Sequence, residues 1–436
     1  MATERGRRVL VLSEDPVGEE MGGNAIRAYE LAKALAGEAR VEVVLAAPVR
    51  GRPPQEIALV DFDREDPTAL SRHLRGVDVV LALPQNPVVA AVLGRSGARV
   101  VYDLYDPKPL QMLEAHTGST ALKRRYWSTI ALDHVLEALA GADYLICASE
   151  RQRDMWLGAM LASRLITPAV YDADPTLRSV IDVVPFGVPD LAPQTGGPGP
   201  FERFATLDPD AEIVLWNGGL WNWLDPVCAV EAIALVLERR PKARLVFMGR
   251  PPGVAGQDRQ AQAARALAER LGLLDRAVFF NDAWVPYGER GAWLARASCA
   301  LSLHVEHLET RFSFRTRVLD CLWAQVPAVC TAGDELAELV SRRGLGAAVP
   351  PGDPVAVADA IVGVLEAGRA AYRDALAEVA EGYRWSAVAA PLVRYVLDPG
   401  ATHRPRPPKL EAPLRRARAL ATRSARALGR AARRIS

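Results

Sequence analysis

The sequence is poor in the residues that make strong metal and redox signatures. Its five cysteines are scattered along 436 residues and form no C-x-x-C pair. Isolated cysteines in apolar runs are typical of buried thiols in a reducing compartment. Two of the six histidines, His304 and His307, lie close together around Glu306, but their spacing fits no strong zinc signature. We therefore expect no metal site and no bound cofactor.

Long hydrophobic runs are also missing. No apolar run approaches the roughly 18 residues that a membrane-spanning helix needs. The polar residues 1–8 lead directly into a strand-like segment, without the apolar core of a signal peptide. We therefore expect a cytoplasmic protein without a spanning helix.

A broad basic surface is absent from most of the chain. The net charge is +1, but residues 403–436 hold eleven Lys or Arg and one acid, a net of +10, which leaves 1 − 10 = −9 on the first 402 residues. A mildly acidic body argues against nucleic acid as a partner. The basic tail carries Leu and Ala at steps of three and four residues. It is either a helix on an anionic membrane surface, which we favour, or a disordered segment.

What the sequence contains is an alternation of short apolar runs with longer helical patterns. This alternation predicts an α/β fold with parallel sheets and crossover helices. A Pro/Gly-rich stretch at 192–200 divides two series of such units. The predicted organisation is an N-terminal domain at 1–191, a linker at 192–200, a second domain at 201–382, a closing helix at 383–398 with Pro391 inside it, and a basic tail at 399–436.

Residues 308–327 are the stretch around which the chain is organised. They follow an apolar strand-like run and lead into a predicted helix. The first turn of a helix has unpaired N–H groups and a positive dipole, and three arginines crowd this same region: Arg311, Arg315 and Arg317. Such an arrangement is unfavourable unless an anion binds there. The alternative is a solvated basic helix start, and the residues alone leave the two about even.

The carboxylate of Asp320 belongs to the same predicted helix. It shares a helical face with Ser313 and Arg317, so it is placed to accept hydrogen bonds from sugar hydroxyls beyond the phosphates. Alternatively, it forms an intrahelical ion pair with Arg317.

Two loops of the N-terminal half also follow predicted strands. Gly22 and Gly23 precede a helix at 25–36 and allow close backbone approach of a ligand, although a tight turn is the commoner explanation. Asp103 and Asp106 end a buried strand, where open α/β sheets bind their ligands. Asp before Pro also simply initiates turns.

The first loop of the second half combines glycines with aromatic residues. Gly218 and Gly219 free the backbone to approach a ligand, and Trp221 and Trp223 can wall a sugar or a base. Asp225, followed by Pro, is expected to cap the next helix. The two tryptophans could instead pack at a domain interface. We favour ligand contact, because the arginine-rich turn lies at the same sheet edge.

These features together resemble the two-domain, retaining glycosyltransferases of the GT-B fold, family 4. The resemblance covers nearly the whole chain to about residue 398. The segments that carry it are Gly22-Gly23, Val183–Val188, Phe280–Pro286, Val318–Pro327, Gly333–Glu335 and Gly344–Pro354. It implies two Rossmann-like, doubly wound domains, of which the first binds the acceptor and the second binds the nucleotide sugar.

The resemblance also implies a function. The chain is expected to be a metal-independent, hexosyl-type transferase that moves a sugar from a nucleotide diphosphate to a glycan or lipid-linked acceptor of the cell envelope, with retention, at the inner face of the plasma membrane. The implied catalytic residues are Asp103, Asp106, Arg315 and Arg317. The implied donor-binding residues are Gly22, Gly23, Gly218, Gly219, Trp221, Trp223, Trp284, Val285, Glu309, Arg311, Phe312, Ser313, Phe314, Thr316 and Asp320. The alternatives are a non-catalytic nucleotide-binding subunit and a sugar-nucleotide epimerase.

The chain departs from the family at its donor motif. Family members bracket the donor with two glutamates eight residues apart, but here the first position is Phe312 and the second is Asp320. Glu309 lies close by and is a candidate substitute. The loop at 218–221 lacks the Arg and Lys that neutralise the diphosphate in the family, so the three arginines of 308–327 are expected to supply that charge.

Overall fold

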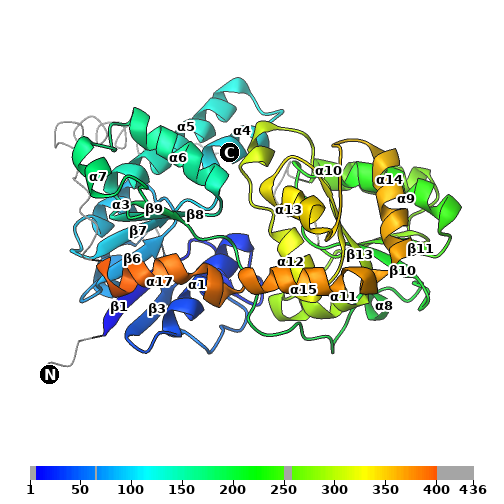
Figure 1. Ribbon diagram of the computed structural model, residues 1–436, viewed down its shortest axis with the longest axis horizontal. Helices are drawn as coiled ribbons and strands as arrows, with labels where there is room; N and C mark the ends of the chain where they lie inside the picture. Colours follow the sequence, from blue (N-terminus) through cyan, green and yellow to red (C-terminus); the bar gives the residue numbers. More distant parts are fainter. Residues whose placement is uncertain (1–5, 64–65, 250–257, 400–436) are drawn as a thin grey trace, which may run out of the picture.

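The computed structural model describes residues 6–63, 66–249 and 258–399. Two parallel sheets, each flanked by helices, form two lobes that lie side by side (Figure 1). The strand order is β5-β3-β1-β6-β7-β8-β9 in the seven-stranded N-terminal sheet and β12-β11-β10-β13-β14-β15 in the six-stranded C-terminal sheet. The order therefore reverses beside β1 and beside β10, as in doubly wound folds. The predicted fold class, two Rossmann-like domains, is confirmed.

The N-terminal lobe is built from apolar strands that are buried between helices. Its strands are β1 (Arg7–Leu12), β3 (Val41–Ala46), β5 (Ala58–Val60), β6 (Val79–Ala82), β7 (Arg99–Asp103), β8 (Tyr144–Cys147) and β9 (Ile181–Val183), with a separate pair β2 (Val17–Gly18) and β4 (Val49–Arg50). Its helices are α1 (Gly23–Ala36), α2 (Pro67–His73), α3 (Pro87–Leu93), α4 (Lys108–Ala115), α5 (Ala121–Gly141), α6 (Glu150–Ala162) and α7 (Pro168–Ala173). Central strands of a parallel sheet are covered on both faces, so they are continuous apolar runs.

The C-terminal lobe repeats this plan. Its strands are β10 (Glu212–Trp216), β11 (Ala243–Phe247), β12 (Val278–Phe280), β13 (Ala297–Ser302), β14 (Ala328–Thr331) and β15 (Gly346–Val349). Its helices are α8 (Pro200–Arg203), α9 (Pro226–Arg239), α10 (Arg259–Arg270), η1 (Tyr287–Glu289), α11 (Arg290–Arg296), η2 (Leu308–Arg311), α12 (Thr316–Ala324), α13 (Glu335–Arg343), α14 (Pro354–Ala367), η3 (Arg369–Tyr372) and α15 (Arg373–Gly382). The Asp225 carboxylate accepts from the Cys228 N–H at 3.0 Å, so it caps α9 as predicted.

The chain ends by returning to the N-terminal lobe. The predicted closing helix is divided into α16 (Trp385–Val388) and α17 (Ala390–Leu397), because Pro391 lies in the first turn of α17. The two helices bury an apolar stripe: Val388, Leu392 and Val396. Helix α17 lies against the N-terminal lobe (Figure 1), where Tyr395 stacks on Tyr144 with ring centroids 4.3 Å apart.

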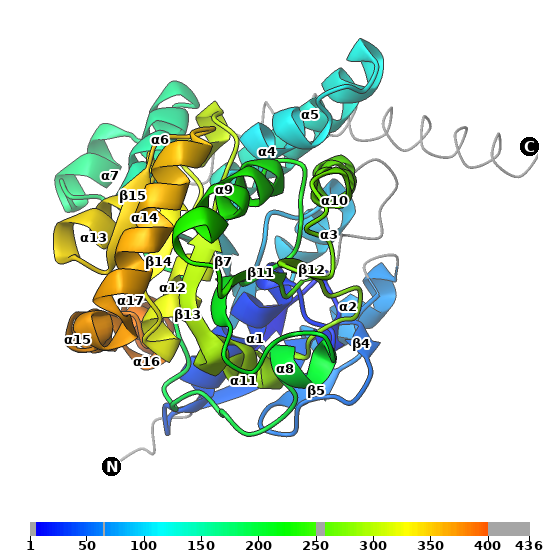
Figure 2. The ribbon, with the colours of Figure 1, turned by 90° about the vertical axis from the view of Figure 1, so that its right-hand side faces the viewer.

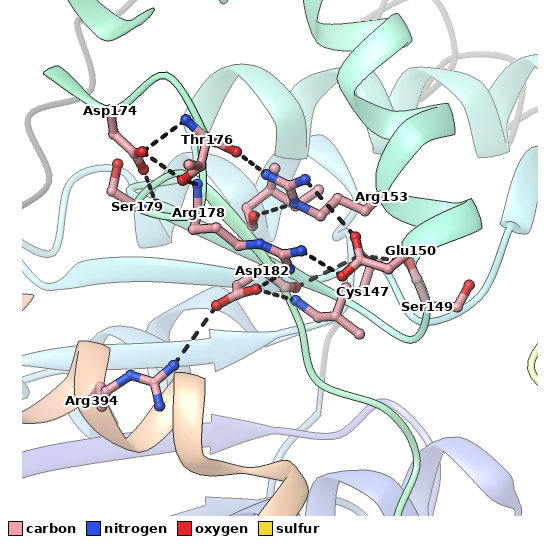
Figure 3. A network of polar contacts seen from close by, with 12 residues as sticks. Cys147, Ser149, Glu150, Arg153, Asp174, Thr176, Arg178, Ser179, Asp182 and Arg394 are labelled. Carbon is pink, nitrogen blue, oxygen red and sulfur yellow. Dashed lines mark hydrogen bonds and ion pairs between the residues drawn. The ribbon is translucent and has the colours of Figure 1, made fainter. Parts of the chain in front are cut away.

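A polar network covers the edge of the N-terminal sheet where α17 docks (Figure 3). Asp182, at the centre of β9, lies 3.9 Å from the guanidinium of Arg394 in α17. Arg178 pairs with the same carboxylate at 2.5 Å and with Glu150 of α6 at 2.5 Å. The network therefore connects three elements of the N-terminal lobe with the last helix of the chain.

The crossing between the lobes depends on a close contact at Gly187. A Cβ atom there would lie 2.6 Å from the Trp385 ring, so only glycine lets this indole pack under the crossing strand. Within the described stretches, no helix combines the length and the apolar character needed to cross a bilayer. The basic tail at 403–436, to which we assigned membrane binding, lies outside the described residues.

Candidate functional site

Loops at the carboxyl ends of both sheets meet between the lobes. Gln152, fully buried at the start of α6, donates to the Tyr105 carbonyl at 2.7 Å and to the Phe312 carbonyl of the C-terminal lobe at 2.8 Å. Nearby, Arg151 pairs with Glu338 at 2.5 Å. The arginine-rich stretch is therefore held against the edge of the N-terminal sheet at which Asp103 and Asp106 lie.

The N-terminal edge holds a closed pair of charges. Arg27, 1% exposed in α1, donates from Nε to Asp103 Oδ2 at 2.5 Å and from Nη2 to Oδ1 at 3.0 Å. Its remaining N–H groups bond the carbonyls of Val184 and Pro185 at 2.8 and 2.9 Å. Asp103 also accepts from the Tyr105 N–H at 3.1 Å. The sequence led us to predict that Asp103 orients an acceptor; in the structure both of its carboxylate oxygens accept hydrogen bonds within the chain, and it braces the crossing between the lobes.

The glycine loop before α1 remains open. Gly22 and Gly23 are exposed, and a Cβ atom at either position would meet no atom within 4 Å. A small pocket beside this loop is lined by Ser13 and Asn24 among others and reaches the Arg27–Asp103 pair. The backbone at these glycines is therefore accessible from outside the chain.

The C-terminal edge has a different arrangement, centred on Arg317. This side chain leaves the first turn of α12 and crosses the Gly218–Gly219 loop, where it donates to the Gly219 carbonyl. A Cβ atom on Gly218 would lie 2.4 Å from Arg317 Nε, so this glycine makes room for the guanidinium. The cation that the loop lacks in sequence is thus supplied by α12.

Arg317 has no carboxylate partner in the described part of the chain, and its Nη1 has no hydrogen-bond partner there. Burial, together with the positive charge of Arg315, lowers the pKa of Arg317 to about 9. The group therefore stays charged at neutral pH. Arg317 is half-buried, but its Nη1 atom is inaccessible, and leaving such an N–H group without a partner is costly. Groups of this kind concentrate at functional sites.

Arg315 is partly neutralised. Its Nε lies 2.6 Å from Asp334 Oδ2, and both side chains are buried. Asp334 also caps α13 by accepting from the Ala337 N–H at 2.8 Å. Burial lowers the pKa of Arg315 to about 10, against the effect of Asp334. Its Nη1 and Nη2 have no hydrogen-bond partner among the described residues. Arg315 thus joins the starts of two helices and keeps two donors unused.

The other residues of the predicted arginine-rich stretch do not all lie at the start of α12. Helix α12 begins at Thr316, so Ser313 precedes it and does not share a face with Asp320, contrary to our prediction. Ser313 instead donates to the Thr310 carbonyl at 3.2 Å. Arg311 is exposed at the end of η2, while Phe314 is buried. Of the three arginines, only Arg317 lies in the first turn of the helix.

Asp320 pairs with Arg290 rather than with Arg317. Arg290 Nε lies 3.1 Å from Asp320 Oδ1, and its guanidinium is placed between the rings of Tyr287 and Trp323, 3.7 and 4.6 Å from their centroids. Tyr287 in turn donates to Glu30 of α1 at 3.0 Å. The Asp320 side chain remains 24% exposed, which leaves carboxylate surface for a sugar hydroxyl.

Two predicted carboxylates come together from opposite lobes. Glu309 in η2 is buried, and burial, followed by the negative charge of nearby Asp106, raises its pKa to about 8. Gln111 of α4 hydrogen-bonds Glu309 and also donates to Asp106 at 3.1 Å. Glu309 is thus protonated near neutral pH and can donate a hydrogen bond. The predicted candidates Asp106 and Glu309 therefore share one polar cluster.

The aromatic residues divide between packing and the interlobe edge. Trp221 and Trp223 stack on each other with centroids 5.1 Å apart and pack on the C-terminal core. Trp284 is 36% exposed, and its indole N–H donates to the Glu19 carbonyl of the N-terminal lobe at 3.2 Å. Val285 beside it is half-buried. The Trp284 segment therefore spans the two lobes beside the open glycine loop.

Sequence reasoning missed Arg27, Gln152 and Arg290. Gln152 had a usable signal, because Ser149-x-x-Gln152 fits a capping box, and Ser149 does accept from the Gln152 N–H at 3.2 Å. Arg27 stands on the apolar face of the predicted helix at 25–36, which is a weak sign of a buried cation. Arg290 gave no local signal, since its partner Asp320 is 30 residues away.

Comparisons with known proteins find similarity to glycosyltransferases. Residues 211–367 match the family model described as glycosyl transferases group 1. The chain is 30% identical over 274 residues to D-inositol 3-phosphate glycosyltransferase of Frankia alni, an alignment that spans 61% of this chain and 62% of that relative.

Solved structures reproduce nearly the whole fold at low sequence identity. Sucrose-phosphate synthase from Thermosynechococcus elongatus aligns with a TM-score of 0.60 at 16% identity, over 91% of this chain and 100% of that one. Trehalose 6-phosphate synthase from Burkholderia multivorans gives 0.64 at 14%, over 91% and 99%. Anabaena HepE in complex with UDP-glucose gives 0.58 at 13%, over 90% and 99%. The chain therefore has the GT-B fold and is similar to the family 4 glycosyltransferases, whose group 1 family model its C-terminal domain matches.

Proposed function

We propose that the chain transfers a hexose-like sugar from a nucleoside diphosphate sugar to a glycan or lipid-linked acceptor, with retention at the anomeric carbon. The observation that carries this proposal is the unpaired guanidinium of Arg317 at the start of α12. A leaving diphosphate develops negative charge as the glycosidic bond breaks, and fixed N–H donors in a dry site stabilise that charge. Arg317 and the helix start are such donors.

Further support comes from the fold and from a relative. The carboxyl ends of parallel strands at a switch point are where open α/β sheets bind ligands, and Arg317 lies at that edge beside β10 and β13. One structural neighbour, HepE, was solved with UDP-glucose. The same donor class is proposed for this chain.

We assign a role to each remaining polar residue of the site from its position. Asp320, steadied by Arg290, is placed to accept from hydroxyls of the donor. Protonated Glu309 is placed to donate a hydrogen bond to the sugar or to the phosphate, in place of the glutamate that the family motif has at Phe312. Asp106, in the same cluster, is the carboxylate that orients the acceptor or balances an oxocarbenium-like centre. No metal is required in this scheme, and we expect turnover to persist in EDTA.

The test begins with a thermal-shift screen of nucleoside diphosphate sugars, because a ligand that binds only the native state raises its melting temperature. The stabilising donor is then incubated with candidate acceptors, and the anomeric configuration of the product is read by NMR. Arg317→Met is compared with Arg342→Met, which removes an exposed guanidinium on α13. Loss of transfer in Arg317→Met alone supports the assignment, and equal activity in both variants contradicts it.

One alternative has specific support in the structure. Asp103 is paired with Arg27, and Phe312 stands at the position of the family's first glutamate. A subunit that binds nucleotide without catalysis would tolerate both of these features. Such a subunit would bind nucleoside diphosphates in a titration but would neither hydrolyse nor transfer the donor. An epimerase would instead isomerise the donor without any acceptor, which the same NMR assay detects.

A further inference from the structure

Helices α4 and α5 form a hairpin whose outer part is not covered by the rest of the described chain. None of the side chains of α4 is buried, although Leu110, Met112 and Leu113 are apolar. The first buried side chain of α5 is Ala131, well inside that helix. Figure 2 shows α5 projecting at the upper right beyond the other elements, with α4 below it. The tip of the hairpin therefore presents apolar surface to its surroundings.

Two leucines make this surface unusual. Leu122, in the first turn of α5, is 80% exposed, and Leu113 of α4 is 37% exposed. Single exposed leucines are common on soluble proteins. Here, however, the same hairpin also carries Trp127, which is half-buried and lies beside His116 and Tyr126 with ring centroids at 5.7 and 5.3 Å. Aromatic rings and exposed aliphatic groups on one element are typical of interfacial surfaces.

The charge of the hairpin is strongly biased. Residues 108–132 contain four Lys or Arg and a single acid, Glu114. The basic residues, Lys108, Lys123, Arg124 and Arg125, are exposed. None of them forms an ion pair within the described residues. Three of them occupy the first turns of α5, where the helix dipole disfavours cations. Arg124 Nε donates to the Leu113 carbonyl at 3.2 Å, which places this cation beside the exposed leucine.

We propose that the α4–α5 hairpin docks on an anionic lipid bilayer, with Leu113 and Leu122 entering the interface and the four basic side chains contacting headgroup phosphates. Charge complementarity selects this occupant, because unpaired cations around aliphatic side chains match a negatively charged surface with an apolar interior. The site is distinct from the basic tail at 403–436. Docking on a bilayer does not require sugar transfer, so this proposal can be tested independently of the proposed function.

The position of the hairpin gives the docking a consequence for the substrate. Gln111 of α4 hydrogen-bonds Glu309 in the candidate site. Arg259 of α10 also reaches the hairpin turn, 3.4 Å from the Thr117 carbonyl. A bilayer bound at this hairpin therefore lies next to the cluster of Gln111, Asp106 and Glu309, which joins the two lobes. If the chain is a transferase, this geometry favours an acceptor that is anchored in the membrane.

The first experiment places an environment-sensitive fluorophore at position 122 of the full chain. All five native cysteines are buried, so a nitrobenzoxadiazole label on Leu122→Cys is selective. Leu161→Cys on α6, where the leucine is 63% exposed, is the matched control. With vesicles containing phosphatidylglycerol we expect a blue shift and an intensity rise at 122 only, and little change with pure phosphatidylcholine. An unchanged signal at 122 while the protein sediments with the vesicles means that the tail binds alone, which overturns the proposal. Equal changes at 122 and 161 also overturn it.

The second experiment tests the charges by vesicle sedimentation of the full chain. K123Q/R124Q/R125Q should lower the partition constant roughly a hundredfold, about fivefold for each charge removed. R72Q/R75Q/R95Q removes three exposed cations on and beside α2 and α3 and should lower it far less. Equal losses in the two triple variants, or no loss in the first, would refute docking through the hairpin. No sugar nucleotide is present, so the outcome says nothing for or against transfer.

Discussion

The two sheet edges that meet between the lobes each hold an arginine, buried in the case of Arg27 and half-buried in the case of Arg317, and their donors are used to very different degrees. At the N-terminal edge, all three nitrogens of Arg27 donate hydrogen bonds, to Asp103, Val184 and Pro185. At the C-terminal edge, Arg317 has one backbone acceptor and no carboxylate, and its Nη1 is unmet within the described residues. The first pattern is that of a structural brace. The second leaves a charge available for a ligand.

This difference shows that the role of an arginine inside the chain depends on how many of its donors are used. A buried charge whose donors are all used stabilises the fold that holds it, whereas a buried charge with unused donors lowers stability unless a ligand completes it. The same substitution at the two arginines should therefore have opposite consequences.

The largest effect is expected from Arg27→Met. This change leaves Asp103 buried without its partner, which should lower the free energy of unfolding by about 3–5 kcal/mol. Urea unfolding followed by circular dichroism measures it. Arg27→Met/Asp103→Leu removes both charges and should recover much of the loss, because the cost comes from the unpaired carboxylate. A single variant as stable as the wild type would show that the brace contributes nothing.

Arg317→Met should lower the transfer rate roughly 10²-fold, as expected when one donor to a developing anion is lost. Its stability should equal or exceed that of the wild type, because a half-buried charge with an inaccessible and unpaired Nη1 atom is removed. Steady-state kinetics and thermal unfolding of the same preparation test both statements. A destabilised protein with normal turnover would place Arg317 in the same structural class as Arg27.

Arg315→Met is the intermediate case and sharpens the comparison. It removes the partner of buried Asp334, so a loss of stability is expected. The loss should be smaller than that of Arg27→Met, because Arg27 also donates to the Val184 and Pro185 carbonyls, whereas Arg315 Nη1 and Nη2 bond no described residue. It also removes two unused donors next to Arg317, so turnover should fall as well. Thermal unfolding and kinetics would show both changes together. An effect on stability alone would exclude Arg315 from the anion site.

The pH dependence of stability isolates Glu309. Its pKa is raised to about 8 in the folded chain, so the folded state binds this proton more tightly than the unfolded state does. The protonated carboxyl therefore contributes fully to stability below the unfolded-state pKa near 4.5, and this contribution is lost as the pH rises through 8. Glu309→Gln should therefore unfold at a temperature close to that of the wild type at pH 4.5 and several degrees higher at pH 8. Melting curves of both proteins across this range test it, and parallel curves would contradict the raised pKa.

The smallest effect is expected at the outer edge of the N-terminal sheet. Arg394 is largely exposed and lies 3.9 Å from Asp182, so Arg394→Gln should cost well under about 1 kcal/mol. The stacked Tyr395–Tyr144 pair, not this ion pair, should hold α17 on the N-terminal lobe. Urea unfolding that showed a large loss in Arg394→Gln would reverse that ranking.

The fold could be predicted from the sequence because central parallel strands are continuous apolar runs. The apolar runs at 41–46 and 328–331, for example, are the strands β3 and β14. The strands β5, β9 and β15 lie at sheet edges and are short or half-buried. Local apolar character is weak there, so no local signal distinguishes them from loops.

The candidate site was predictable only in part, for a physical reason. The crowding of arginines near a helix start is a local feature, and the sequence shows it. Which arginine stays unpaired depends on partners far along the chain, such as Asp103, 76 residues from Arg27. The predicted helical face of Ser313 and Asp320 failed because α12 starts at Thr316. The sequence therefore shows which charged residues gather near the helix start. Whether each of them has a partner is seen only in the tertiary structure.

The central claim is that Arg317 holds the diphosphate of the donor, and calorimetric titration tests it most directly. The best-binding nucleoside diphosphate is titrated against its monophosphate, with the wild type and with Arg317→Met. We expect the wild type to prefer the diphosphate and Arg317→Met to lose roughly ten- to hundredfold of that preference, the worth of a charge-assisted hydrogen bond. An unchanged preference in Arg317→Met would contradict the account.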